Sequence, residues 1–246
     1  MVEAVSEGVS DPEAEGLAFF PQLARRNLGE EATRYLRDAL LSGRYRAGEK
    51  MAVQPLTLAL NISAMPVREA LLTLAGEGLL EATPRRGFRV ARTSVRDVQD
   101  VFRVHALVAG LLAEEAAPLF DKQGIGRLLG LQNQIELTFA SRVSAAERSS
   151  LIEEHNFAFH RVINHVPDAP RLRWFLRAST RYVPRHFYHQ IPGWVEATRS
   201  DHPKIIDALR RHDAVEARRL VELHALEAGR LVTDNLAQKG LVKESS

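Results

Sequence analysis

The 246-residue chain contains no cysteine, which excludes disulfide bonds and thiolate metal sites. It also lacks an apolar run close to the ~20 residues that a transmembrane helix needs. Its first sixteen residues, MVEAVSEGVSDPEAEG, have neither the basic segment nor the apolar core of a signal peptide. These absences predict a cytoplasmic protein without a membrane partner.

A large excess of either charge is missing too, because 33 Lys and Arg nearly balance 31 Asp and Glu. The distribution is nevertheless uneven. Residues 1–22 carry five acidic and no basic side chains, whereas residues 23–93 carry twelve Lys and Arg against seven Asp and Glu. A local positive charge favours contact with phosphate groups. We expect residues 1–26 to form a disordered tail that precedes this basic segment.

Residues 61–76 predict a short helix. Ser63 is a favourable N-cap, and Pro66 falls in the first turn, where its missing N–H costs nothing. Apolar residues then recur at helical spacing. They are Val67, Ala70, Leu71 and Leu74. Arg68 lies off that apolar face and is free to contact a partner.

Residues 79–90 predict a β-hairpin with Pro84-Arg85-Arg86-Gly87 at its tip. Upstream, residues 29–41 and 55–60 predict two further helices. This order of elements is typical of a winged helix-turn-helix, whose helix enters the major groove while its wing lies along phosphates. An ordinary α+β fragment with a solvated basic turn is the alternative.

The segments LLSGRYRAGEKM and SAMPVREALLTLAGEGLLEATPRRGFRV resemble the DNA-binding domain of the GntR family of bacterial transcription regulators, over roughly residues 28–92. The resemblance implies a double-stranded DNA operator as partner. It places the DNA contacts at Ser63, Met65, Arg68, Arg85, Arg86 and Gly87. Relatives usually carry arginine after the capping serine, where this chain has Ala64, so its operator can differ from theirs.

Beyond the linker at Thr93 and Ser94 the pattern is helical and shows no strand-like alternation. The expected helices are 95–117, 122–140, 145–165, 168–190, 200–211 and 213–236. We therefore predict a mainly α protein: a winged helix-turn-helix over residues 27–93, followed by an antiparallel helical bundle over residues 94–238. Residues 239–246 are expected to be a tail.

All nine histidines lie in the second part. Asn156 and His160 are four residues apart and share a helix face, which we expect to be bracketed by core residues. These are Phe157, Phe159 and Ile163. Joined by His202 and His224 from two other helices, the pair could hold a divalent metal, since imidazole suits Zn²⁺, Ni²⁺ or Co²⁺. Spacing alone is weak evidence for a metal site, because a single histidine in such a pattern is more often a surface residue or a satisfied core residue.

This all-helical part resembles the FCD ligand-binding domain of the FadR-type subfamily. The resemblance implies that Asn156, His160, His202 and His224 bind a metal that helps to hold a carboxylate effector. Many relatives carry aspartate in place of Asn156, so a lower metal affinity is expected here. His105 and Ala109 stand where relatives usually carry arginine and glutamate. We expect effector contacts from His105, Arg181 and Arg185.

These observations favour a ligand-responsive regulator that binds a pseudo-palindromic operator as a homodimer, with repression relieved by ligand as the usual behaviour of the family. Three alternatives use the same histidines: a metal-dependent enzyme, a pure metal sensor, and a metal-free bundle with a polar core. The HExxH, nucleophile-elbow and P-loop patterns are absent, which argues against the enzyme.

Overall fold

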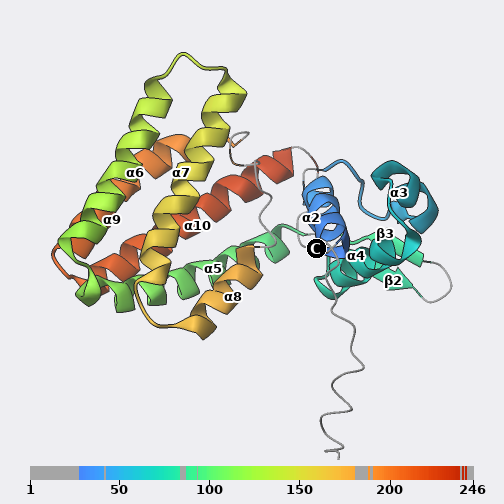
Figure 1. Ribbon diagram of the computed structural model, residues 1–246, viewed down its shortest axis with the longest axis horizontal. Coiled ribbons are helices and arrows are strands. Elements are labelled where there is room, and N and C mark those ends of the chain that lie inside the picture. The colour runs from blue at the N-terminus through green and yellow to red at the C-terminus, as the bar shows by residue number, and fades with distance from the viewer. Residues whose placement is uncertain are drawn as a thin grey trace, which may run out of the picture.

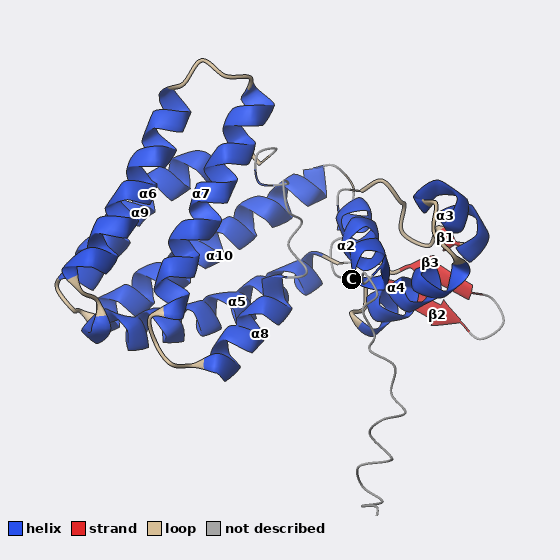
Figure 2. Ribbon diagram, in the orientation of Figure 1, coloured by secondary structure: helices blue, strands red, loops and turns tan. Residues whose placement is uncertain are grey.

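The computed structural model describes residues 28–41, 43–83, 87–92, 94–180, 188, 191–238, 240 and 242. The expected tail at residues 1–26 lies outside these residues. The described chain forms a winged helix-turn-helix followed by a helical bundle (Figure 1), as the sequence predicts. Strands occur only in the first of these two parts, within the described ranges (Figure 2).

Over its described residues, the winged part contains three helices and a small antiparallel sheet. The helices are α2 (Leu28–Leu41), α3 (Val53–Leu60) and α4 (Ala64–Gly76), and the strands are β1 (Lys50–Met51), β2 (Leu80–Thr83) and β3 (Gly87–Val90). The strand order is β1-β3-β2. Helices α3 and α4 meet at 115°, and the turn between them places Asn61 in the left-handed region (φ 52°), which asparagine tolerates. Leu36, Leu71 and Leu74 are fully buried between α2 and α4.

The helical part is built from α5 (Val95–Ala116), the 3₁₀ turn η1 (Ala117–Leu119), α6 (Lys122–Ala140), α7 (Ala145–His165), α8 (Pro170–Thr180), α9 (Trp194–Arg210) and α10 (Ala214–Gln238). Helix α5 packs along α10, α6 along α7, and α9 against both α6 and α10. Within the described residues, no single helix has the length and apolar composition of a membrane span; the bent pair α3 and α4 meets these criteria only when taken together.

Two expected helix boundaries need comment. The helix expected at 200–211 begins at Trp194, because the apolar face continues upstream through the buried Trp194 and Thr198. Pro203 therefore lies inside α9 and not in its first turn. Of the helix expected at 168–190, only Pro170–Thr180 is described as helix; residues 181–187, 189 and 190 lie outside the described residues.

A glycine sets the close approach of α5 and α10. A Cβ atom at Gly229 of α10 would lie 2.5 Å from Cβ and 2.5 Å from Cγ of Phe102 on α5. Because Gly229 has no side chain, the backbone of α10 can pack directly against Cβ and Cγ of Phe102 on α5. Since α5 carries His105 and α10 carries His224, this contact also fixes the spacing of two candidate site residues.

In Gly229→Ala, Phe102 or a helix must move to admit the methyl group, which costs about 1–3 kcal/mol. The alanine gains about 1 kcal/mol in helix propensity. The free energy of unfolding should therefore fall by up to about 2 kcal/mol. Urea unfolding measures the change. Gly126→Ala in α6 is the matched control, since a Cβ there meets nothing within 4 Å. Equal stability of the two variants would show that the α5–α10 contact is not tight.

Candidate metal centre and nucleic-acid interface

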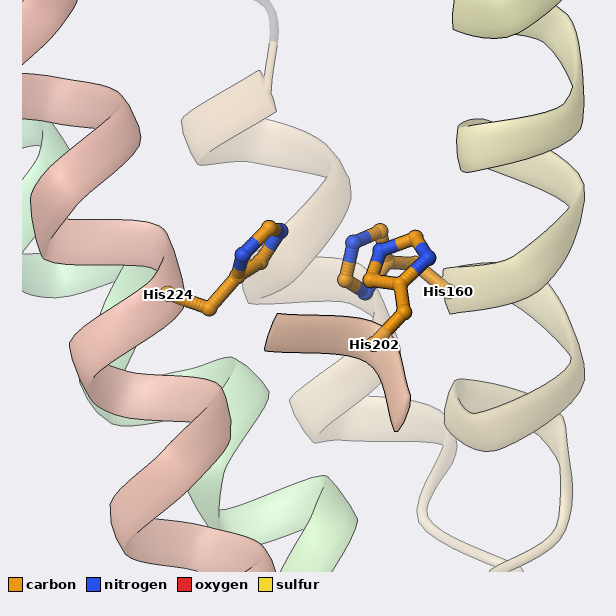
Figure 3. Close-up of side chains that lie close together, drawn as sticks. All are labelled: His160, His202 and His224. Carbon is orange, nitrogen blue, oxygen red and sulfur yellow. The ribbon is translucent and has the colours of Figure 1, made fainter. Parts of the chain in front are cut away.

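Three imidazoles from three helices converge in the helical part. His160 comes from α7, His202 from α9 and His224 from α10, and the side chains point toward one another (Figure 3). Their ring centroids are 5.1 to 5.3 Å apart. One ring nitrogen from each lies within 4.8 Å of the other two, so the cluster could hold a metal ion. The structure thus brings together three residues that are 64 positions apart at their extremes in the chain.

Hydrogen bonds fix which nitrogen of His202 carries the proton. Its Nδ1 lies 3.0 Å from Oε1 of Gln132, whose amide nitrogen donates to Glu136 at 3.0 Å. A carboxylate only accepts, so the amide oxygen must face the imidazole and Nδ1 must donate. Nε2 of His202 therefore keeps its lone pair. It is buried and has no hydrogen-bond partner among the described residues.

His224 has an equivalent partner. Its Nδ1 lies 3.4 Å from a carboxylate oxygen of Asp201. This places the proton on Nδ1 and leaves Nε2 as the atom that can coordinate a cation. Histidine ligands of metals characteristically donate their other ring N–H to a carboxylate or carbonyl group. Gln132 and Asp201 occupy that role here, and both orient an imidazole without touching the centre of the cluster.

Asn156 lies one turn before His160 in α7, as the sequence predicts. Its side chain is buried, and Oδ1 has no hydrogen-bond partner among the described residues. Leaving such an oxygen unsatisfied costs about 1–3 kcal/mol. A cation held by the imidazoles would remove this cost for both Asn156 and Nε2 of His202. The three imidazole nitrogens suit a divalent metal such as Zn²⁺ or Ni²⁺, and the unpaired oxygen of Asn156 is the candidate fourth ligand.

Burial keeps these imidazoles in the form that binds metal. Desolvation lowers the pKa of His160 and His202 well below the usual value of 6.5, and the neighbouring imidazoles lower both values further. The ring of Phe159 stacks on His202 at a centroid distance of 3.7 Å and shields it from water. At neutral pH both side chains are uncharged, so protons do not compete with a cation for their lone pairs.

A cavity of about 1100 Å³ adjoins the cluster. Asn156, His160 and His224 form part of its wall. It is also lined by His105, Phe157, Arg161, Arg173, Arg177, Tyr188 and Trp194, and toward the winged part by Glu30, Glu31, Arg34, Arg37 and Asp38 of α2. Phe159 and Ile163 are buried core residues, as predicted, but the prediction for Phe157 was wrong. Its side chain is 40% exposed because its helix face borders this cavity.

The three predicted effector-binding residues have different outcomes. Arg181 and Arg185 lie outside the described residues. His105 lines the cavity, and its Nδ1 is 3.1 Å from Oγ of Ser179. Burial, followed by the nearby His224, lowers the pKa of His105 to about 4. Its imidazole is therefore neutral at physiological pH.

Sequence reasoning missed the residues that orient the imidazoles. Gln132 had a detectable signal, since it is a polar residue on the buried face of α6, in register with Ile125, Leu128 and Ile135. Asp201 directly precedes His202 but gave no pattern of its own. Ser179 is paired with a residue 74 positions away, which no local pattern indicates.

Three residues at the start of α4 that were predicted to contact DNA are exposed: Ser63, Met65 and Arg68. Ser63 occupies the N-cap with extended backbone, yet its side chain makes no capping hydrogen bond within the described part of the chain. Its hydroxyl group is therefore available to a partner. Gly87 starts β3 with φ 83°, a left-handed conformation that favours glycine at the end of the wing turn. Arg85 and Arg86 lie outside the described residues.

An ion pair ties α2 to the end of α4. The guanidinium of Arg37 contacts both carboxylate oxygens of Glu77, the residue after α4, at 2.8 to 3.0 Å. The two side chains are only 15% and 12% exposed. Such a bidentate, largely buried pair holds its partners in one geometry. Arg37 also lines the cavity, so the same side chain borders the candidate site and holds the helix that would contact DNA.

Gln132→Met should weaken metal binding between about tenfold and a hundredfold, because His202 loses the acceptor that sets its tautomer and orientation. A competition titration of Zn²⁺ against a chromophoric chelator measures the affinity. Gln134→Met is the matched control, since Gln134 is exposed on the same helix. An unchanged affinity in Gln132→Met would exclude this residue from the support of the site.

Comparison with known proteins agrees with both parts of the structure. The family model for bacterial regulatory proteins, gntR family, matches residues 28–90, and that for the FCD domain matches residues 100–227. The HTH-type transcriptional repressor RspR of Escherichia coli K12 is 25% identical over 209 residues, which cover 81% of this chain and 86% of RspR.

An uncharacterized HTH-type transcriptional regulator of Mycobacterium tuberculosis H37Rv is 24% identical over 159 residues. The match covers 65% of this chain and only 62% of the length of that relative. Among solved structures, E. coli McbR/YncC has the same fold, with a TM-score of 0.60 at 20% identity over 87% of this chain and 97% of that one. The two family models together account for the winged part and for most of the helical bundle, and the chain belongs to the gntR family of bacterial regulatory proteins and carries an FCD domain.

Proposed function

We propose that this protein is a transcription regulator that binds operator DNA as a homodimer and responds to a small organic acid held at a divalent metal in its helical domain. One observation carries the proposal: three imidazoles from three helices converge beside a large cavity, in the domain that follows a winged helix, and the buried, unpaired amide oxygen of Asn156 belongs to the helical turn before His160. Repression is the expected direction of control, since the relative RspR is named a repressor.

The DNA contacts belong to the winged part. The exposed N-terminal turn of α4 presents Ser63, Met65 and Arg68 to the major groove. Arg85 and Arg86, which lie outside the described residues, are expected from the sequence to contact phosphates. Ala64 offers no hydrogen-bonding side chain in that turn. A dimer of such heads reads two half-sites related by its two-fold axis, so the operator is a pseudo-palindrome.

The effector site is the metal centre and its cavity. A cation on His160, His202, His224 and Asn156 supplies a positive charge that attracts a carboxylate. Neither imidazole nor amide ligands carry a negative charge, so none of them cancels that charge. Arg161 and Arg177 on the cavity wall add to the positive potential. An anionic ligand is therefore favoured over a neutral one of the same shape.

Helix α2 is the proposed connection between effector and DNA. It stands on the side of the winged part that faces the bundle (Figure 1) and lines the cavity with five charged residues. Arg37 then joins it to the end of α4. An effector that binds one placement of α2 more tightly than another shifts the placement of α4, which is the requirement for allosteric control.

Arg68→Ala should weaken binding to a selected operator by about 1–3 kcal/mol if Arg68 makes a bidentate contact with a base. Fluorescence anisotropy on a duplex selected by the purified protein measures the affinity. Arg127→Ala removes an exposed arginine of α6 and serves as the control. If Arg68→Ala bound the operator with wild-type affinity, Arg68 would not be one of the residues that contact the bases.

The purified protein should contain about one divalent metal per chain, and a small carboxylate should raise its melting temperature only while the metal is bound. Elemental analysis and a thermal-shift screen with and without EDTA test both points. His160→Ala and His224→Ala should each lose the metal and still bind DNA non-specifically, since the winged part has its own core.

Stoichiometric metal in both variants would refute the ligand assignment. DNA affinity that follows the metal concentration, with no acid acting, would instead identify a metal sensor. Absence of metal and of any stabilising acid would contradict the proposed site as a whole.

A further inference from the structure

We propose that His105 is a hydrogen-bond acceptor that selects a hydroxylated carboxylic acid as effector, in preference to an acid without hydroxyl groups or one with a second carboxylate in that position. The inference rests on the proposed metal-bound carboxylate and adds the chemical class of the ligand. The observation behind it is the hydrogen-bond arrangement His105–Ser179–Leu176 at the cavity wall.

The first step is the proton on Ser179. Its Oγ lies 2.8 Å from the carbonyl oxygen of Leu176, one turn back in α8, and 3.1 Å from Nδ1 of His105. A carbonyl oxygen only accepts, so the single hydroxyl proton of Ser179 is donated to Leu176. Oγ can then only accept from the imidazole. His105 must therefore carry a proton on Nδ1.

The second step concerns the other nitrogen of His105. A neutral imidazole carries one proton, so with Nδ1 protonated, Nε2 has a lone pair and accepts hydrogen bonds. His105 lines the same cavity as His160 and His224. A divalent cation on those imidazoles would further oppose a second proton on His105. Nε2 is thus the polar atom that this side chain offers to a ligand.

The third step is the match with a ligand. An ionised carboxylate has acceptors only, so it cannot pair with Nε2 and would leave two sets of lone pairs opposed. A hydroxyl group donates one hydrogen bond and satisfies the nitrogen. A site that leaves a polar group unpaired with the wrong ligand discriminates against that ligand. An acid that places its carboxylate on the metal and a hydroxyl on His105 satisfies both groups.

Matched pairs of acids test the proposal on the 246-residue protein loaded with Zn²⁺. Gluconate against hexanoate compares equal carbon chains with and without hydroxyls, and malate against succinate does so for a shorter chain. Isothermal titration calorimetry should show tighter binding of the hydroxylated member, between about threefold and tenfold for one added hydrogen bond.

Variants of His105 and Ser179 assign the effect. His105→Phe keeps an aromatic ring but removes the acceptor, so each pair should bind equally while the zinc content stays the same. His105→Arg replaces the acceptor by a cation and should reverse the order toward a second carboxylate, with succinate binding more tightly than gluconate. Ser179→Ala removes the oxygen that keeps the proton on Nδ1 of His105. It should therefore reduce the preference for hydroxylated acids without changing the zinc content.

The outcomes separate this inference from the function on which it rests. If no acid binds the zinc-loaded protein, or acids bind equally well after EDTA treatment, the proposed effector site is wrong and this inference falls with it. If acids bind only with zinc but both members of each pair bind equally, only the role of His105 is overturned. A hydroxyl preference that persists in His105→Phe would likewise overturn it.

Discussion

Buried polar atoms that need a partner constrain the helical domain. Nε2 of His202 and Oδ1 of Asn156 lie away from water, and no described residue satisfies them. Two hydrogen bonds make the constraint stronger. Gln132 accepts from Nδ1 of His202 and Asp201 accepts from Nδ1 of His224, so the Nε2 lone pairs of both rings are left for the cluster. Such an arrangement is costly when empty and stable when a cation binds it. Metal binding is thus expected to be part of the stability of the domain.

Features that depend on residues close together in the sequence were predictable, whereas contacts between residues far apart in the sequence were not. The winged part and the Asn156–His160 pair depend on helical spacing within one element, and both were predictable. The start of α9 was not, because Pro203 resembles a first-turn proline although the buried face begins at Trp194. Gln132 and Ser179 meet their histidines across 70 and 74 residues, so only tertiary packing reveals their roles.

The connection between the cavity and the winged part also depends on residues that are far apart in the sequence. Nothing in the local sequence marks Arg37 as different from other helical arginines, yet it reaches Glu77 across 40 residues and also borders the cavity. Exposed ion pairs add little to stability, but this one is bidentate and largely buried. A displacement of α2 must therefore either move α4 or break the pair. A ligand that displaced α2 would therefore also act on α4, the helix proposed to contact DNA.

Affinity and selectivity have different sources in such a site. A divalent cation attracts every small carboxylate, so it contributes strength and little discrimination. Selectivity must then come from neutral groups on the cavity wall with a defined donor or acceptor character. His105 is such a group, because Ser179 and Leu176 fix its proton through hydrogen bonds that do not involve the ligand. The acceptor is therefore set before any effector arrives, and a ligand without a donor at that point loses binding energy that the metal cannot restore.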